Sequence, residues 1–343
     1  MTSEAAAGQR RRRIVGSLLG LAISIALLYV TLRSVSFADV LTHFRNSRPG
    51  PLILAVIVAT LTFGVRVLRW RYLLRTEDDR PVGWSPLWHA TAMGFMANNT
   101  LPLRMGELLR CYAASRLGKV PFTAALSSVA VERALDALTI GAMLTIALFT
   151  SGLPPETQIA GVGRLDQVAL RAGVICAVIF SGALFVVLFP VLAERIVRKV
   201  VPWRRIADRI INLIEGLRLG FGALRSVSRL LAAVLWSIVH WVMSAASFWL
   251  AFGAFSIEVG FTGAVLVMCL LAIGIAAPSS PGYFGIFELV VAASLSLFGV
   301  PRDIGVAYGL TYHIATFIPI TLLGLWSLAV TPIGIKDIRA VPP

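Results

Sequence analysis

Charged side chains are scarce in this sequence. Asp, Glu, Lys and Arg make up only 14% of its 343 residues, against about 25% in soluble proteins. Hydrophobic residues reach 57%, and the mean hydropathy is +0.83. This composition excludes an ordinary soluble protein and predicts an all-α, polytopic helical membrane protein. We expect residues 1–343 to form a single transmembrane domain.

Acidic residues are the scarcer charged group. There are 17 Asp and Glu against 31 Lys and Arg, which gives a formal net charge of +14. In a soluble protein this excess would suggest nucleic-acid binding. In a membrane protein it indicates cytoplasmic loops that face anionic lipid. We therefore expect no nucleic-acid partner.

Cysteine and histidine are also few. The three Cys and four His show no spacing typical of disulfides or metal sites. The sequence also lacks a phosphate-binding loop, the G-x-S-x-G and H-E-x-x-H motifs and a paired D-x-D. These absences argue against an ATPase, a serine hydrolase, a zinc protease and a nucleotide-sugar transferase. We expect a protein that is not an enzyme and that uses no cofactor and no metal.

What the sequence does contain is long apolar runs, whose length is sufficient to cross a bilayer. They predict membrane-spanning helices at 14–32, 52–68, 122–149, 172–193, 230–255 and 304–335. Arg66 lies near enough to the end of its run to reach the membrane surface. The one long polar segment, 191–229, predicts amphipathic helices on the cytoplasmic surface.

The distribution of basic residues predicts the orientation. Most Lys and Arg lie on one side if the N-terminus, 66–80, 104–119, 191–229 and the C-terminal tail are all cytoplasmic. The apolar run 84–102 must then enter and leave on the same side, as a re-entrant hairpin. We expect a multi-pass protein of the plasma (inner) membrane with both termini in the cytoplasm.

Two breaks in the apolar pattern resemble each other. Pro102 is followed by Gly106 and Glu107, and Pro281 is followed by Gly285 and Glu288. Each break precedes a long apolar run. This pattern is typical of inverted repeats, in which broken helices meet near the midplane of the membrane. The halves would be 14–150 and 167–335.

Three charged residues lie inside the long apolar run 122–149. On a helix, Glu132, Arg133 and Asp136 share one face, and Arg133 and Asp136 can pair at i,i+3. Charges within the bilayer are costly and usually pair or line a polar path. Two interpretations stay open: an ion-pair cluster that fixes helix packing, or the lining of a substrate cavity.

The first break is rich in polar groups. Asn98, Asn99 and Pro102 precede Arg104, and a helix starting near Arg104 would place that residue on one face with Glu107 and Arg110. Guanidinium groups suit phosphate oxygens. The alternative is ordinary positive charge at the cytoplasmic surface.

The second break combines two prolines with two glycines, and its backbone must face protein or water. A helix restarting near Gly282 would direct its positive N-terminal dipole at a cavity, where an anion could bind. The alternative is a plain kinked helix or a tight turn. The residues expected at this part of the site are Pro278, Ser279, Pro281, Gly282, Tyr283, Gly285 and Glu288.

Together these motifs resemble the lysylphosphatidylglycerol synthase transmembrane-region family of flippase-like membrane proteins. The matching runs are N-N-x-x-P-x-R-x-G-E-x-x-R at 98–110, V-E-R-x-x-D at 131–136 and P-S-S-P-G-Y-F-G-I-F-E at 278–288. The resemblance covers about 14–335. It implies re-entrant segments and a role in moving a lipid or lipid-linked headgroup. The soluble aminoacyl-transfer domain of the synthases is not in this sequence, so synthase activity is not expected.

The leading interpretation is a lipid translocase of flippase or scramblase type, with an arginine-lined cavity for the headgroup of an anionic phospholipid or a polyprenyl-phosphate-linked lipid. One of the carboxylates Glu107, Glu132, Asp136 or Glu288 would carry a coupling proton or neutralise the arginines. The alternatives are a membrane enzyme acting on such headgroups, a small-anion transporter, or an accessory subunit of a synthase or glycosyltransferase. Homo-oligomerisation also stays open.

Overall fold

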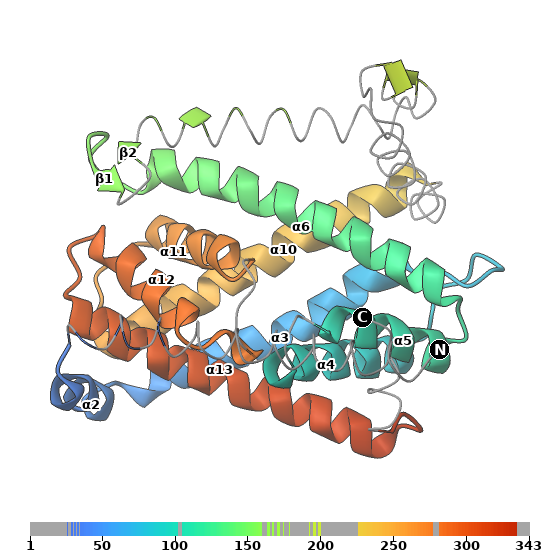
Figure 1. Cartoon of the computed structure of the whole chain (residues 1–343), viewed down its shortest axis with the longest axis horizontal. Helices are drawn as coiled ribbons and strands as arrows, with labels where there is room; N and C mark the ends of the chain where they lie inside the picture. Colours follow the sequence, from blue (N-terminus) through green and yellow to red (C-terminus); the bar gives the residue numbers. More distant parts are fainter. Residues whose placement is uncertain are drawn as a thin grey trace, which may run out of the picture.

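The computed structural model describes residues 35–101, 105–159, 226–276 and 281–334, together with scattered positions between 26 and 33 and between 163 and 199. Within these residues the protein is almost entirely helical, which confirms the predicted all-α class (Figure 1). Four described helices are long and apolar enough to cross a membrane: α3 (Pro49–Leu73), α6 (Phe122–Thr150), α10 (Val227–Phe252) and α13 (Arg302–Val330).

Two pairs of shorter helices lie between these long ones. The first pair is α4 (Trp84–Thr100) and α5 (Gly106–Gly118). The second is α11 (Phe261–Gly274) and α12 (Ile286–Ser296), joined through the 3-10 turn η3 (Pro281–Tyr283). At 1.5 Å per residue even α4 rises only about 26 Å, less than the roughly 30 Å of hydrocarbon in a bilayer.

Each pair of short helices is a hairpin. The prediction that the run 84–102 forms a hairpin by itself is wrong, because Trp84–Thr100 is one continuous helix and the returning limb is α5. Gly94 of α4 lies against Arg110 of α5, and nearer the turn Asn98 lies against Gly106. Gly274 of α11 likewise lies against Val290 of α12, while Gly263 lies against Phe298 just beyond α12. The order long helix, hairpin, long helix therefore occurs twice along the chain.

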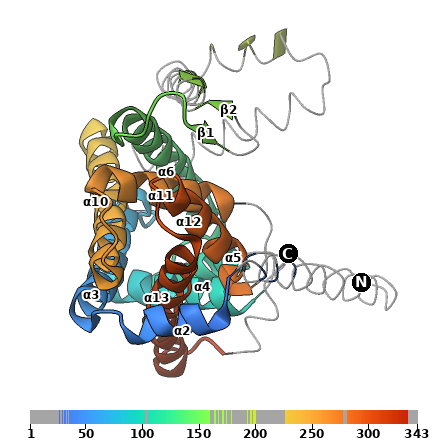
Figure 2. The ribbon, with the colours of Figure 1, turned by 90° about the vertical axis from the view of Figure 1, so that its left-hand side faces the viewer.

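The two halves run in opposite directions. Ser247 of α10 donates a hydrogen bond to the backbone oxygen of Ala55 in α3, and Arg69 near the end of α3 donates to Ser237 near the start of α10. Helices α3 and α10 are thus antiparallel neighbours, side by side in both ribbon views (Figures 1 and 2). The α4–α5 hairpin lies at one end of the molecule and the α11–α12 hairpin at the other, as an inverted repeat requires.

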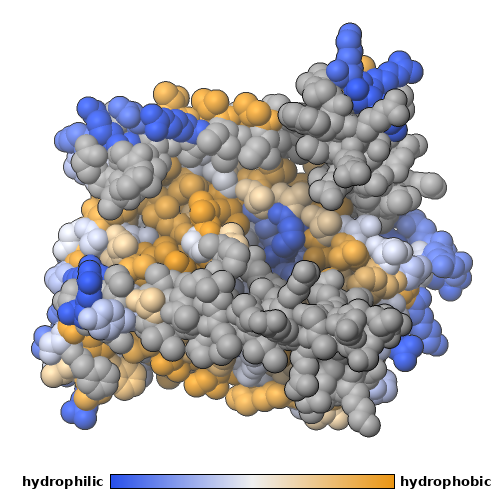
Figure 3. Space-filling model, viewed as in Figure 1, coloured by the Kyte–Doolittle hydropathy of each residue, from blue (hydrophilic) through white to orange (hydrophobic). Residues whose placement is uncertain are grey.

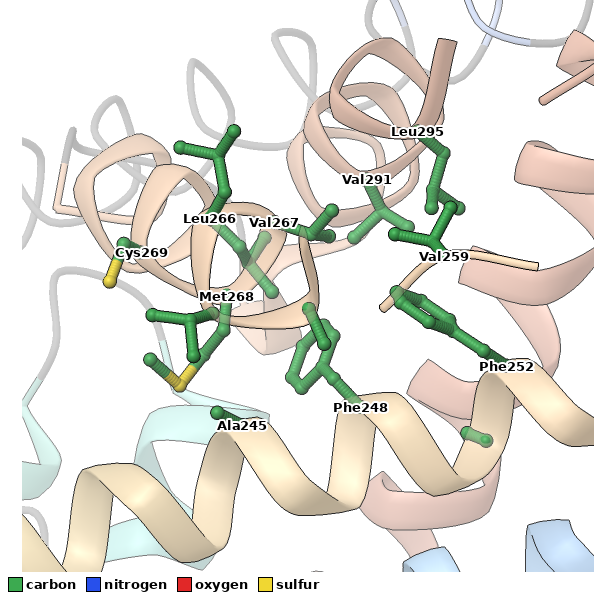
Figure 4. Close-up of a cluster of buried hydrophobic side chains, with 14 of the residues drawn as sticks. Ala245, Phe248, Phe252, Val259, Leu266, Val267, Met268, Cys269, Val291 and Leu295 are labelled. Atoms are coloured by element: carbon green, nitrogen blue, oxygen red, sulfur yellow. The ribbon is translucent and has the colours of Figure 1, made fainter. Parts of the chain in front are cut away.

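The core of the second half is apolar. Side chains of α10, α11 and α12 interdigitate around Phe248, Phe252 and Met268 (Figure 4). On the outside, large apolar side chains such as Leu235, Leu322 and Trp326 are exposed, and the visible face carries broad orange areas (Figure 3). Such an exterior suits contact with lipid chains.

Small elements complete the described part. Helix α2 (Phe37–Arg45) lies beside α13, β1 (Gln158–Ile159) and β2 (Gly163–Arg164) form a hairpin, and η2 (Gly253–Phe255) follows α10. The predicted spans 14–32 and 172–193 and the polar segment 191–229 fall almost entirely outside the described residues.

Candidate functional site

Glu132 of α6 is the centre of a buried ion-pair cluster. Its Oε1 atom lies 3.0 Å from Arg69 of α3, 2.8 Å from Arg110 of α5 and 2.6 Å from Arg133 of α6. Arg110 also donates a second hydrogen bond to Oε2, at 2.9 Å. One carboxylate thus joins three helices and contacts three guanidinium groups.

Asp136, one turn further along α6, extends this cluster. It forms an ion pair with Arg69 and lies 2.9 Å from Arg133, as the i,i+3 spacing predicts. The indole nitrogen of Trp241 in α10 donates to it at 2.9 Å, and Arg69 donates to Ser237 at 3.0 Å. The second half of the chain therefore takes part in holding the cluster.

Positive charge exceeds negative charge here. Arg66, on α3 one turn before Arg69, lies within electrostatic range of Asp136. Its guanidinium carbon lies 4.7 Å from the centre of the Phe95 ring, and its Nη1 atom is buried with no hydrogen-bond partner in the described part of the chain. The prediction that Arg66 reaches the membrane surface is wrong, because its guanidinium group lies against α4. Among the described residues, four arginines here face three carboxylates, the third being Glu107, 3.8 Å from Arg133.

The cluster is closed on most sides and open at Arg133. The side chains of Arg69 and Glu132 are 0% exposed, whereas that of Arg133 is 43% exposed. Figure 3 shows a hydrophilic patch in the middle of the apolar face, over the part where Figure 1 draws α6 crossing α10. A permanently charged group is thus reachable from outside at the middle of a membrane-spanning helix.

The first break is held by amide side chains. Asn98 Oδ1 accepts a hydrogen bond from the backbone nitrogen of Gly106 at 2.9 Å, and Asn99 Nδ2 donates to Thr321 of α13 at 3.0 Å. A side chain at Gly106 would overlap the backbone oxygen of Gly94, so glycine permits this close approach. Helix α5 begins at Gly106, two residues later than expected. Of the predicted site residues in this region, Pro102 and Arg104 lie outside the described part of the chain.

The second break touches the first. Gly282 has a left-handed φ of 71°, and a Cβ atom there would lie 3.2 Å from the backbone oxygen of Asn99. Tyr283 next to it is also left-handed, with φ 62°, and is half-buried. The two halves therefore meet at their breaks. Pro281 begins the 3-10 turn between them, while Pro278 and Ser279 lie outside the described residues.

The helix after the second break begins at Ile286, not near Gly282 as the sequence predicts. The reason is local: Gly282 and Gly285 both adopt positive φ, 71° and 92°, which a helix cannot contain. Glu288 then accepts a hydrogen bond from the backbone nitrogen of Gly285 at 2.7 Å. The expected anion position at this helix start is occupied by the protein's own carboxylate.

Glu288 has a second partner that the sequence analysis did not assign to the site. His313 Nδ1 of α13 lies 2.7 Å from Glu288 Oε1, and the two side chains are only 6% and 1% exposed. The imidazole stacks on the ring of Phe287, with ring centres 4.1 Å apart, and the tilted ring of Phe284 lies 4.5 Å away. This is a carboxylate–imidazole pair in an aromatic enclosure.

Sequence reasoning also missed Arg69, Ser237 and Trp241. The available signal was Arg69 itself, a second arginine one turn after Arg66 near the end of a span. In the described part of the chain no group of three or more His, Cys, Asp or Glu gathers to hold a metal. A cavity of about 790 Å³ along α12, bordered also by Thr157, Leu270 and Arg302, is mainly apolar and includes none of the charged residues above.

Fold and site define a class: a multi-pass, all-helical membrane protein in which two oppositely directed halves meet at broken helices beside a buried arginine cluster. The family described as "Lysylphosphatidylglycerol synthase TM region" matches residues 17–324. The chain belongs to this family.

Archaeal membrane proteins are among its relatives. A UPF0104 membrane protein of Methanocaldococcus jannaschii is 23% identical over 91% of this chain and 94% of its own length. A UPF0104 membrane protein of Methanothermobacter thermautotrophicus is 26% identical over 80% of this chain and 81% of its own length. The glycosyltransferase AglD of Haloferax volcanii is 26% identical over 47% of this chain and 24% of its own length.

Proposed function

We propose that this protein is a lipid translocase that moves an anionic phospholipid, or a lipid linked through polyprenyl phosphate, between the two leaflets. The supporting observation is the excess of arginine over carboxylate in the cluster around Glu132, together with the 43% exposure of Arg133. An anionic headgroup arriving at Arg133 balances this excess charge. Arginine suits phosphate because its planar fork donates two parallel hydrogen bonds.

In this proposal the two hairpins are re-entrant, and their breaks at Asn99 and Gly282 line the headgroup path. The acyl chains stay in the bilayer while the headgroup passes. The end of the molecule where α3 ends and α10 begins is cytoplasmic, because Arg75, Arg80 and Arg229 lie there. The membrane is the plasma (inner) membrane, and both termini are cytoplasmic.

Movement of lipid is favoured over chemistry on it, so the protein is proposed not to be an enzyme. Glu132 and Asp136 are each held by at least two guanidinium groups. A general base must have a free acceptor directed at its substrate. These carboxylates instead have the partners expected of groups that position arginines.

The partial match to AglD favours a second candidate: an accessory subunit that serves a glycosyltransferase acting on a lipid-linked sugar. The two candidates share a lipid headgroup at Arg133. They differ in whether the protein alone moves that lipid.

A leaflet-specific assay with purified protein in liposomes tests the proposal. A fluorescent phosphatidylglycerol is placed in the inner leaflet, and its arrival outside is followed by chemical quenching. Arg133→Ala is expected to abolish the movement while the protein remains inserted. The matched control is Arg45→Ala, which removes an exposed arginine of α2 far along the chain from the cluster. Unchanged movement in Arg133→Ala, or none with the unaltered protein, contradicts the proposal.

A further inference from the structure

The buried pair of Glu288 and His313 is a site with a different chemistry from the arginine cluster. We infer that Glu288 and His313 together form a proton-binding site, and that one proton crosses the membrane with each anionic lipid. This inference rests on the proposed lipid movement and adds its energy source.

The partners of the four candidate carboxylates separate their roles. Glu132 and Asp136 each contact several arginines, and Glu107 lies 3.8 Å from Arg133. Proton binding there would leave guanidinium groups without a counter-charge. The partner of Glu288 is an imidazole, the one side chain that ordinarily gains and loses a proton near neutral pH.

The surroundings make the charge of this pair important. With a neutral imidazole the pair carries one negative charge, and with one added proton it is neutral overall, whichever atom holds that proton. Buried net charge is costly. Because Phe284 and Phe287 enclose the imidazole and both polar side chains are nearly inaccessible, the proton-loaded pair suits this buried arrangement better than the charged pair does. Release requires water to reach the pair.

Other titratable groups near the pair are few among the described residues. Helix α10 presents Ser247, whose hydroxyl lies 2.7 Å from that of Tyr312 beside His313. Helix α11 carries only the Cys269 thiol, which lies near the backbone of α6. Helix α4 carries His89, paired with Ser327 more than three turns from His313. The turn η3 contains Tyr283, which carries a phenol. Helix α2 carries His43, which pairs with Asp303 at the start of α13.

The position of the pair links proton occupancy to the lipid path. Glu288 also accepts a hydrogen bond from the backbone nitrogen of Gly285, so it holds the second break in its present shape. Three residues before Gly285, Gly282 contacts the first break at Asn99. Loss of the proton leaves a net negative charge in the aromatic enclosure, which favours opening of this junction to water and reorientation of the break. The proton passes from water on one side to the pair, and from the pair to water on the other side.

Lipid redistribution under an imposed pH difference tests this inference. The probe is a trace of fluorescent phosphatidylglycerol in liposomes with equal potassium and valinomycin on both sides. One proton per singly charged lipid predicts a leaflet ratio of about tenfold per pH unit at equilibrium. Glu288→Gln and His313→Gln are expected to abolish this dependence. The matched control is Asp303→Asn, which alters the partly exposed carboxylate–imidazole pair with His43 and should retain the full ratio.

Each result separates the two proposals. Lipid movement in the unaltered protein with an even distribution at every pH difference overturns the proton inference and leaves the translocase standing. No lipid movement at all overturns both. A full pH response in Glu288→Gln also overturns the assignment.

A second measurement covers variants that move no lipid. Proton uptake on binding short-chain phosphatidylglycerol is followed in weakly buffered detergent solution. At a pH at which the lipid-free protein has released this proton, the unaltered protein is expected to take up about one proton per lipid bound, and Glu288→Gln none. Equal uptake by the two proteins overturns the inference.

Discussion

Arg110 holds Glu132 through two parallel hydrogen bonds, from Nη1 to Oε1 at 2.8 Å and from Nη2 to Oε2 at 2.9 Å. On its other side the guanidinium group lies over the ring of Trp70, 3.8 Å from the ring centre. This contact ties the short helix α5 to α6 and α3. It makes the shape of the arginine side chain, as well as its charge, part of the fold.

Replacing Arg110 with Lys should therefore destabilise the protein although the charge is kept. Lysine cannot form the paired hydrogen bonds or stack on Trp70, and we expect a loss of about 2 kcal/mol. Thermal unfolding in detergent measures it. Arg116→Lys, on the exposed part of the same helix, is the control and should change stability by no more than about 0.5 kcal/mol. Equal effects of the two substitutions would show that the paired geometry is unimportant.

Arg133 should be reachable from water even though it lies within a membrane-spanning helix. In a protein whose native cysteines are replaced by serine, Arg133→Cys is expected to react with a charged, water-soluble thiol reagent, measured by mass. Ile146→Cys is the matched position on α6, because Ile146 is 62% exposed but on an apolar exterior. It should react far more slowly, since the reagent needs a hydrated thiolate. A higher rate at Ile146 contradicts the open cluster.

Gly106→Ala should push apart α4 and α5, the two helices of the first hairpin. The added methyl group would overlap the backbone oxygen of Gly94 and the side-chain amide of Asn98, and backbone cannot move aside cheaply. A loss of about 1–3 kcal/mol is expected, together with slower lipid movement. Gly50→Ala, with nothing within 4 Å of the new methyl group, should leave stability unchanged or slightly raised. If Gly106→Ala left the stability of the protein unchanged, this close approach would be ruled out.

Asp79 should contribute stability that depends on pH. Arg229, at the start of α10, donates hydrogen bonds to both of its oxygens at 2.8 and 2.6 Å, and these hold the pKa of the Asp79 carboxyl below its usual value of 3.8. Because the folded-state pKa is lowered, the stabilisation is fully present above the unfolded-state pKa and disappears as the pH falls through the folded-state pKa.

The measurement compares melting temperatures of the unaltered protein and Asp79→Asn across pH. The unaltered protein should melt at a higher temperature than Asp79→Asn near pH 7, and this difference should vanish in acid well below the usual carboxyl pKa. Asp78→Asn, at the exposed neighbouring position, should show no difference at any pH. A difference that stays constant into acid would mean that the Arg229 contact does not act through the charge of Asp79.

Much of the fold could be predicted because each long helix carries its own signal. Apolar runs at 52–68, 122–149, 230–255 and 304–335 correspond to α3, α6, α10 and α13 within a few residues. The helix boundaries beside the breaks were less accurate. Their positions depend on backbone conformations such as φ 92° at Gly285, which follow from packing as much as from residue type.

The candidate site was predicted in part. Spacing on one helix places Arg133 and Asp136 together, and the structure has that pair at 2.9 Å. Arg69 and His313 have no local pattern that leads to their partners. They lie 67 and 25 residues from Asp136 and Glu288, so only the packing of separate helices brings each pair together.

Composition and hydrophobic runs were sufficient to establish a membrane-spanning helical protein, because the cost of exposing backbone and charge to hydrocarbon acts on every segment separately. Which charges neutralise one another was decided by tertiary structure. The antiparallel packing of α3 and α10 brings Ser237 and Trp241 to the cluster on α6, and the contact between Asn99 and Gly282 joins the two breaks. A partner on another helix is specified by distance in space, and the spacing of residues along one segment does not determine that distance.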